Sequence, residues 1–478
     1  MYGAGVRRRL PVTVPLLVLA AAFPAAAAGA MHVDAHPGLS PAFRPGIQDY
    51  VTRCNPKKAV RLSITAPSGE TLRLNGRPAR SGSFHERIRL GVGQRLRLTT
   101  EGGRRYFVRC LPRDFPHFKV QRFGTPQSQW WLLAPDIAHY VMFLDSHATP
   151  VWWIKQKHVP FSSVLFANDE IAWTRYFDHP MGILDSEAWQ VHRLDGTHLR
   201  TFKTKGSPID THDFEREPSG NYLLETYKLR RDVDLRAYGK EKHSNVLDAE
   251  VQEQTPDGKL LWRWNSKDHI GLEETQVWPN PRVIKLPDGT KAYDIIHLNS
   301  IEPDGDGVVI SARRLNAVFR ISRKTGDLTW KLGGSRRPES LTVVGDPMDQ
   351  TFNAQHDARL LPDGDVTVFD NRTGIGAPRG VRFRIDTAQR TATFISQIAD
   401  PKVDFSGAQG STRVLPGGNW VEDWGSNNPA SELTPAGKVL LRVYFKGGGS
   451  YRTTPLPYGR LAASKLRGAM DRMYARRK

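Results

Sequence analysis

Cysteine and long apolar runs are scarce in this sequence. Only Cys54 and Cys110 occur among 478 residues, and the most apolar run, "PVTVPLLVLAAAF", covers residues 11–23. A membrane-spanning helix needs about 20 mainly apolar residues, so a membrane anchor is the weaker interpretation of this run. Arginines precede it in "RRRL", and a small-x-small cleavage site follows at residues 28–30. We therefore predict a removable signal peptide over residues 1–30 and an exported protein that is periplasmic, cell-surface or extracellular.

The two cysteines suit an oxidising compartment. No cysteine comes directly after the expected cleavage site, so nothing indicates a lipid-anchored form. In an exported protein an even cysteine count favours a disulfide. We predict that Cys54 and Cys110 form one, joining the first strand of the early region to the last. Two buried free thiols are the alternative.

Acidic residues are outnumbered by basic ones. The chain has 49 Asp and Glu against 68 Lys and Arg, which gives a net charge of +19. Neither a basic stripe interleaved with aromatic residues nor a nucleic-acid motif accompanies this charge, so we expect no nucleic-acid partner. We expect good solubility and a weak attraction of the basic C-terminal tail to anionic cell-surface polymers or lipid headgroups. The sequence leaves the oligomeric state open.

The early part of the chain has the pattern of short strands. We interpret residues 31–47 as a linker. Residues 48–115 contain the alternating segments "AVRLSITAP", "TLRLNG", "HERIRL", "QRLRLTT" and "RYFVRC", separated by Gly, Pro and Asn. This pattern predicts a small N-terminal β-sandwich domain. It has no cluster of catalytic residue types, so we expect a supporting or recognition role.

Residues 117–456 repeat one all-β unit. Six hairpins each end in a strand that often carries Trp or Phe, and a second kind of hairpin lies between them. Four clear copies of this second hairpin hold turn glycines separated by 85, 59 and 54 residues, Gly220, Gly305, Gly364 and Gly418. Two hairpins make a four-stranded sheet, and such sheets repeated around an axis form a β-propeller. We predict six blades, with insertions at 229–247 and 266–294 as loops on one face, and a basic helix over 457–478.

Three histidines occupy equivalent places in these repeats. His212, His297 and His356 each precede a Pro-x-Gly or related turn by a similar distance. The hairpin that they begin comes first in its unit, so it should be the innermost pair of strands. All three side chains can then converge over the central channel. Two other units have Ser162-Ser163 and Gln409-Gly410 at this place, which indicates that the histidines are selected and do not simply follow the repeat.

Other residues of the inner hairpins could reach the same channel mouth. Asn299 lies two residues beyond His297, on the same strand face, and Arg313 ends the return strand "VVISARR". Weaker candidates of the same kind are Gln355, Lys228, Asn371 and Trp424. Asp213 and Asp357 follow histidines directly and need not face the pocket. Blade-to-blade hydrogen bonding or turn capping is the simpler role for these two.

Several segments resemble the bacterial arylsulfate sulfotransferase family. They are "QHDARLLPDG", "HLNSIEPDGDGVVISAR" with "TGDLTWKLGG", and "THDFEREPSGNYLL", and the likeness is closest to a divergent branch of secreted propellers. It covers roughly residues 120–445, and the early strand region looks like that family's N-terminal domain. The resemblance implies a six-bladed propeller that moves a sulfuryl group from a phenolic sulfate ester to another phenol, through a sulfohistidine and without a nucleotide donor or other cofactor.

The motifs of this resemblance assign roles to particular residues. His356 matches the nucleophile, His297, Asn299 and Arg313 match the groups that hold the sulfuryl oxygens, and His212 matches a further pocket histidine. The chemistry is reasonable for these residue types. A neutral imidazole is a competent nucleophile, a nearby cation helps to keep it neutral, and fixed donors stabilise charge on a transferring group.

Two other classes of function stay open at this stage. A non-catalytic extracellular propeller could bind a glycan or a protein partner through its loops. Three histidines could also hold zinc with one position open, although Arg313 and Asn299 suit an anion better, so we predict no metal. The segment "PDGDG" at 303–307 lacks the remaining spaced ligands of a calcium loop and is more simply a turn.

Overall fold

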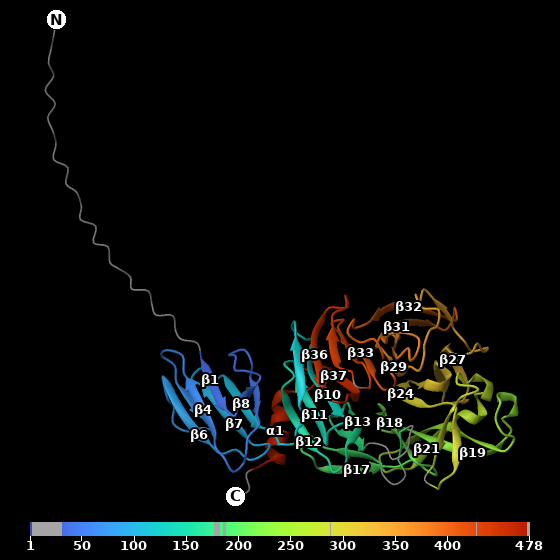
Figure 1. Ribbon diagram of the computed structural model, residues 1–478, viewed down its shortest axis with the longest axis horizontal. Helices are drawn as coiled ribbons and strands as arrows, with labels where there is room; N and C mark the ends of the chain where they lie inside the picture. Colours follow the sequence, from blue (N-terminus) through green and yellow to red (C-terminus); the bar gives the residue numbers. More distant parts are fainter. Residues whose placement is uncertain (2–30, 176–181, 185–187, 287, 427, 476–478) are drawn as a thin grey trace.

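The computed structural model describes residues 31–175, 182–184, 188–286, 288–426 and 428–475, together with Met1 (Figure 1). Within these ranges one α-helix, α1 (Ala463–Met473), accompanies 37 β-strands. The predicted all-β class is therefore confirmed. The expected signal peptide lies outside the described residues. In the described ranges, no helix has the length and apolar character needed to cross a membrane.

Two sheets form the N-terminal region and enclose one hydrophobic core. The first sheet has the order β1 (His32–His36), β4 (Val60–Thr65), β6 (Ser83–Ile88). The second has the order β2 (Leu39–Ser40), β3 (Asp49–Thr52), β8 (Arg105–Cys110), β7 (Arg95–Thr100), β5 (Leu72–Leu74). The predicted disulfide is present: Cys54 bonds to Cys110, with 5.5 Å between their Cα atoms. It joins the ends of β3 and β8, which pair in parallel.

The expected linker is not a linker. Residues 31–47 contribute β1 and β2, and β1 pairs with β4 along five residues. Val33 and Met31 lie in the core, whereas His32 and Asp34 are exposed. The alternation of apolar and polar residues in this segment is that of a half-buried strand. The prolines in and around this segment made its short alternating pattern hard to recognise as strands in the sequence.

Six further sheets follow within the described residues. From the centre outward, the first two sheets are β37 (Ser450–Pro457), β10 (Ser128–Pro135), β11 (Tyr140–Asp145), β12 (Pro150–Lys155), and then β13 (Pro160–Leu165), β14 (Ile171–Arg175), β16 (Trp189–His192), β17 (His198–Phe202). The third and fourth are β18 (Ile209–Arg216), β19 (Tyr222–Val233), β20 (Ser244–Gln254), β21 (Leu260–Asn265), and then β24 (Leu298–Asp304), β25 (Gly307–Ala312), β26 (Ala317–Ser322), β27 (Leu328–Gly333). The fifth and sixth have five strands each: β29 (His356–Leu360), β30 (Val366–Asp370), β31 (Arg379–Asp386), β32 (Thr391–Ile398), β28 (Thr342–Val344), and then β33 (Ser411–Val414), β34 (Trp420–Asp423), β35 (Ala430–Leu433), β36 (Val439–Phe445), β9 (Phe118–Arg122).

The innermost strands of these sheets contact one another in a closed cycle. The order around the centre is β37, β13, β18, β24, β29 and β33, and β33 contacts β37 again (Figure 1). Five of the six come from hairpins that the sequence predicted. The sixth, β37, comes from the C-terminal end of the chain and pairs with β10. The first and last parts of the repeat region thus complete one sheet together.

The insertions extend a sheet and do not form free loops. Residues 229–247 lengthen β19 and β20 on either side of a short 3-10 helix, η1 (Arg236–Tyr238). Residues 266–294 form η2 (Ser266–Asp268), η3 (Leu272–Glu274), β22 (Arg282–Lys285) and β23 (Lys291–Asp294). β23 pairs in parallel with β20, and β15 (Ile183–Leu184) pairs with β18. The prediction of loops was wrong because the lengthened β20 has an unpaired edge, and β23 of the second insertion pairs with it.

The inner hairpins close through the predicted turns. In the turn after β29, the Gly364 N–H donates to the Leu361 carbonyl (2.9 Å), and Gly364 has a φ of 85°. A side chain is rarely tolerated at such a φ. At the other end of the same strand, the register with β30 shifts between His356 and Arg359, and Asp357 has a φ of 57°. This β-bulge turns His356 and Asp357 toward different surroundings.

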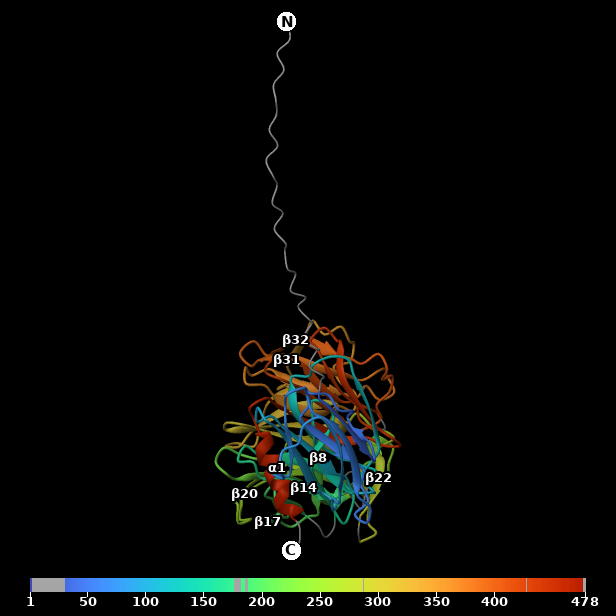
Figure 2. The same ribbon diagram turned by 90° about the vertical axis from the view of Figure 1, so that its left-hand side faces the viewer.

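The predicted C-terminal helix joins the two parts of the molecule. α1 lies between the N-terminal strands and the ring of sheets (Figure 2). Its Arg467 pairs with Asp49 on β3, and its Asp471 pairs with Arg109 on β8 (3.1 Å). Its apolar face packs beside Trp153 on β12 through Met470. Basic side chains of this helix are thus engaged by acidic groups of the same chain.

Candidate active site

The structure brings the three predicted histidines together at the start of inner strands. The ring centroids of His212 and His297 are 5.1 Å apart. Tyr451, on the closing strand β37, has its ring centroid 5.5 Å from that of His212 and 6.3 Å from that of His356. His356 is 2% exposed and His297 is 8% exposed. The strands β18, β24 and β29 are neighbours around the centre, which explains the convergence.

Each histidine ring is held at Nδ1 by a side-chain oxygen. The distances are 2.6 Å from His212 to Asp210 Oδ1, 2.9 Å from His297 to Asp294 Oδ2, and 2.6 Å from His356 to Asn371 Oδ1. A carboxylate accepts only, so Nδ1 carries the hydrogen in the first two rings. Nε2 is then the nitrogen left for chemistry in each ring.

His356 differs because its partner is an uncharged amide. The Asn371 Nδ2 donates to the Gln409 carbonyl (2.9 Å) and to Ser406 Oγ (2.8 Å), and this turns Oδ1 toward the histidine. Nδ1–H of His356 therefore donates to Asn371, and Nε2 holds the lone pair. The Gln409 backbone N–H donates to Nε2 over a long 3.3 Å. This is the one ring of the three whose side-chain partner at Nδ1 carries no negative charge.

Burial and a nearby positive charge also keep His356 neutral. Burial, followed by the nearby Arg313, lowers the pKa of His356 well below its ordinary value. Burial also lowers the pKa of His297 to about 4, although Asp294 acts in the opposite direction. Burial lowers the pKa of Arg313 to about 10, so its guanidinium stays charged at neutral pH. His356 is thus a neutral ring beside a permanent cation.

Arg313 and Asn299 each have a buried polar atom without a hydrogen-bond partner among the described residues. The Arg313 Nη2 donates to the Gly407 carbonyl (2.9 Å), and its buried Nε has no partner among the described residues. The Asn299 Nδ2 donates to the Gln355 carbonyl (2.7 Å), and its Oδ1 is likewise buried and unpaired in the described part of the chain. Buried polar atoms are normally paired. Their presence here is what a site for a polar ligand requires.

The same region contains a group that could hold a metal ion. The ligand atoms of Asp210, His212 and Glu225 lie within 4.8 Å of one another, and all three residues are buried. Burial and the neighbouring Asp210 raise the pKa of Glu225 well above its ordinary value. A protonated Glu225 leaves a single negative charge on this pair, so no cation is needed for charge balance. Among the described residues, this group includes His212 but neither His297 nor His356.

Asp357 and Asp213 face away from the histidines. Asp357 Oδ1 pairs with Arg452 (2.9 Å) and Arg359 (3.2 Å), and its other oxygen pairs with Arg413. Asp213 pairs with Arg359 (2.6 Å) and Arg452 (2.7 Å). We call these five residues the arginine network. The expected hydrogen bonding between sheets is present beside these ion pairs, because the Ile301 N–H donates to Asp213 (2.9 Å) and the Thr412 N–H donates to Asp357 (3.1 Å).

Three other predicted pocket residues lie elsewhere. The Gln355 amide is buried and donates to Ser311 Oγ and to backbone carbonyls of the adjacent sheet, so it braces two sheets. Trp424 lies in an apolar core beside Phe369. The Lys228 ammonium donates to the Gly206 carbonyl (2.9 Å). Sequence spacing placed them on inner hairpins correctly but could not tell which face each side chain takes.

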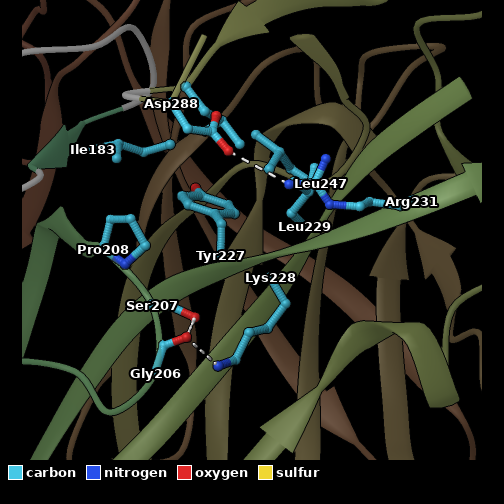
Figure 3. Close-up of a pocket in the computed structure, with 11 residues that line it drawn as sticks. Ile183, Gly206, Ser207, Pro208, Tyr227, Lys228, Leu229, Arg231, Leu247 and Asp288 are labelled. Atoms are coloured by element: carbon cyan, nitrogen blue, oxygen red, sulfur yellow. Dashed lines mark hydrogen bonds and ion pairs between the residues drawn. The ribbon is translucent and has the colours of Figure 1, made fainter. Parts of the chain in front are cut away.

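Lys228 lines a pocket beside the histidines (Figure 3). This pocket has a volume of about 430 Å³, and its wall is formed by β19, β20, the segment before β18 and the second insertion. Tyr227 separates it from Asp210 and Glu225. Arg231 and Asp288 pair across its rim (3.4 Å). None of the three histidines lines this pocket.

Sequence reasoning missed several residues of the site. Asp210 and Asp294 orient two histidines, and their short spacing before those histidines, two and three residues, was the available signal. Tyr451 donates to the Asn299 carbonyl (3.0 Å) and packs against Phe161 (4.5 Å between centroids). Its segment follows the last recognised hairpin, so no repeat marked it.

Comparisons with known proteins add one finding about the family. The sequence model described as arylsulfotransferase (ASST) matches residues 176–446, which include all three histidines and Arg313. No curated protein matches the chain.

Solved structures show only a weak likeness. A protein of unknown function from Bacteroides caccae has 12% identity and a TM-score of 0.39, over 69% of this chain and 99% of its own. Virginiamycin B lyase from Staphylococcus aureus has 11% identity and a TM-score of 0.35, over 73% of this chain and 91% of its own. At these scores, fold and function have to be argued from the chain itself.

Proposed function

The chain belongs to the arylsulfotransferase (ASST) family, and from this premise and the site geometry we propose that it moves a sulfuryl group from an aryl sulfate ester to a phenol. No nucleotide donor or other cofactor takes part. His356 carries the sulfuryl group between two half-reactions, so the kinetics are ping-pong.

In the first half-reaction, Nε2 of His356 attacks the sulfur atom of the ester. The bond from sulfur to the aryl oxygen breaks, and its electron pair leaves with a phenolate that takes up a proton from solvent. A phenol has a pKa of about 10, so phenolate is a tolerable leaving group. The sulfuryl group is then bonded to Nε2, and the ring keeps its Nδ1–H on Asn371.

In the second half-reaction, the oxygen of the acceptor phenol attacks the same sulfur atom. The sulfur–nitrogen bond breaks, its electrons return to Nε2, and the acceptor releases its proton to solvent. The Gln409 N–H, which donates weakly to Nε2 in the resting site, then resumes its place. The enzyme thereby returns to its resting state, with a neutral His356.

Charge on the sulfuryl oxygens is stabilised by Arg313, Asn299 and the two other histidines. The buried Arg313 Nε is available to donate to a ligand, and the Asn299 Nδ2, which donates one hydrogen to the Gln355 carbonyl, has a second hydrogen to donate. An anion beside His297 raises the pKa of that ring, because an opposite charge favours the protonated form. The Asp294 carboxylate that already holds its Nδ1 supports the same change.

The observation that carries this proposal is the neutral partner of one histidine among three. Asp210 and Asp294 place a carboxylate against two of the rings. Asn371 brings no negative charge to His356, so burial and Arg313 can keep that ring neutral, which suits a nucleophile. We infer from this difference that His356, and not His212 or His297, forms the covalent bond.

The test uses 4-nitrophenyl sulfate as donor and phenol as acceptor. Wild-type protein should release 4-nitrophenolate, and a peptide map after exposure to donor alone should show a sulfuryl adduct on His356. His198→Ala, an exposed histidine on β17, is the matched control and should keep full activity. The proposal fails if wild type releases no nitrophenolate or if His356→Ala remains fully active.

We infer further that the six sheets are the blades of a six-bladed β-propeller over residues 117–456. The closed cycle of inner strands supports this inference. In the same way, the two sheets with a common core support a β-sandwich domain over residues 48–115, to which β1 and β2 also contribute. A signal peptide over residues 1–30 would export the chain.

The burial of the rings favours a second candidate function. His356 is 2% exposed, which suits a non-catalytic propeller that binds a glycan or a protein through its loops. Wild-type inactivity, together with ligand binding that survives simultaneous replacement of His212, His297 and His356 by alanine, would establish this alternative.

A further inference from the structure

The N-terminal region concentrates the positive charge of the chain. Residues 31–115 hold 16 lysines and arginines against 6 acidic residues, a net charge of +10 out of +19. This region contains none of the histidines of the candidate active site. The chemistry proposed for the histidine site therefore does not explain the positive charge of this region.

Much of this charge lines one groove of about 790 Å³. Its cations are Arg53, Lys57, Lys58, Arg61, Arg87 and Arg89, and no carboxylate lines it. Among the described residues, none of these six forms an ion pair with an acidic side chain; Arg53 donates instead to the carbonyls of Phe115 and Pro116. The groove is lined by the end of β1, the segment between β3 and β4, and residues in or directly after β4 and β6, and Figure 1 shows β4 and β6 on the side of the N-terminal region away from the ring of sheets.

The strand register places like charges against one another. His36 on β1 is opposite Arg61 on β4, and Arg61 is opposite Arg87 on β6. Like charges directly opposite in a sheet are destabilising. Arg61 and Arg87 are exposed and point from the open face of this sheet. Fold stability does not account for this arrangement, but a bound anion would.

The lining favours a polyanion of one chemical class. No Phe, Tyr or Trp lines the groove, and His36 is its one aromatic ring, so it lacks the series of platforms on which successive nucleic-acid bases stack. No large apolar side chain in residues 31–115 is exposed, so this region has nothing to insert into a lipid surface. The same open face continues from Arg61 to Ser63 and Thr65, and from Arg87 to His85. Hydroxyl and imidazole groups beside cations suit a sugar chain that carries anions.

We propose that this groove binds a polysaccharide with repeated sulfate or carboxylate groups. Guanidinium and ammonium groups contact the anions, and charge-assisted hydrogen bonds of arginine give the stronger contacts. The hydroxyl groups on the same face contact the sugar. Several cations act on one chain, so binding weakens steeply as salt concentration rises.

The experiment measures binding of the full chain to dextran sulfate and to polygalacturonate, with neutral dextran as the negative probe. Arg61→Glu/Arg87→Glu should weaken binding by about tenfold or more, since counterion release depends on the number of cations engaged. Arg73→Glu/Lys259→Glu changes the net charge equally at two exposed sites outside the groove and should leave binding nearly unchanged. Single-stranded DNA and phosphatidylglycerol vesicles serve as competing anions.

A single variant separates binding from folding. Arg87→Glu places a carboxylate opposite Arg61, so the melting temperature should rise while affinity for dextran sulfate falls. The proposal is overturned if wild type does not bind either polysaccharide, or if both double variants weaken binding equally. It is also overturned if DNA or vesicles bind as tightly and depend on Arg61 and Arg87 as strongly.

Discussion

His356 and Asp357 are neighbours in the chain but belong to two buried polar regions of opposite design. In the arginine network, Asp357 and Asp213 each meet two or three guanidinium groups. Burial acts to raise the pKa of Asp213, but the charges of Arg359 and Arg452 lower that pKa to about 2. Around the histidines, by contrast, oxygens of Asp210, Asp294 and Glu225 are buried without a hydrogen-bond partner among the described residues.

The difference indicates what each region is for. A buried ion pair is costly unless its partners satisfy it, and the arginine network satisfies its members from four inner strands and the closing strand. It fixes the sheets to one another at the centre. The histidine region leaves polar atoms unsatisfied, which a structure tolerates mainly at sites that meet a ligand.

The largest expected effect comes from removing the nucleophile. His356→Ala should lower the rate of sulfuryl transfer by on the order of 10⁴-fold or more, because no other group can hold the sulfuryl group. The melting temperature should fall as well, because the buried ring donates to Asn371 and accepts from the Gln409 N–H, so the rate is normalised to folded protein. Nitrophenolate release and circular dichroism provide the two measurements. A residual rate within tenfold of wild type would assign the chemistry to another residue.

Asp357→Asn tests the other member of the pair. The amide keeps the shape and tolerates the positive φ, but it leaves Arg452, Arg413 and Arg359 short of one negative charge. We expect the free energy of unfolding to fall by about 3–5 kcal/mol, with the rate per folded molecule nearly unchanged. Urea unfolding and activity normalised to folded protein give both values. A loss of activity without a loss of stability would mean that Asp357 acts at the site.

Arg313→Gln probes the cation beside His356. Removing one donor to a charged transition state typically costs about 100- to 1000-fold in rate. Arg313→Lys is the matched variant, since it keeps the charge and should recover part of the rate. Steady-state kinetics should show the loss in kcat more than in KM. Equal rates for the two variants would show that the charge of Arg313 is unimportant.

Asn371→Asp sharpens the comparison among the three histidines. The new carboxylate would raise the pKa of His356, because a negative charge beside the ring favours the imidazolium form, as Asp294 does for His297. A raised pKa keeps the ring protonated, and inactive as a nucleophile, to a higher pH. The acidic limb of the pH–rate profile should therefore move to higher pH, with activity returning as pH rises. An unchanged limb would exclude Asn371 as the group that sets the state of His356.

The sequence predicted those features that depend on local pattern. Alternating apolar residues and Pro-x-Gly turns located the hairpins, and the equivalent positions of His212, His297 and His356 predicted that they would meet. The two cysteines predicted the disulfide. The hairpins rest on residues close in sequence, the meeting of the histidines rests on equivalent positions in the repeat, and the disulfide rests on the presence of only two cysteines.

The features that escaped prediction depend on contacts between distant segments. The bulge at Asp357 decides that this carboxylate meets Arg413 and Arg452, and no spacing in the sequence marks it. Trp424 and Gln355 lie on inner hairpins, but packing against the next sheet turns them away from the histidines. Asn371 was predicted to bind substrate, whereas its contact with His356 depends on a return strand and on Gln409.

The origin of β37 has a consequence for biosynthesis. The strand that carries Tyr451 and Arg452 leaves the ribosome after every other strand of the six sheets, yet it pairs with β10, more than 300 residues earlier. Until residue 457 is available, β10 lacks its inner neighbour and the arginine network lacks one guanidinium. A nascent chain that stops before β37 therefore lacks Tyr451 at the histidines, so the site is complete only after β37 has been made.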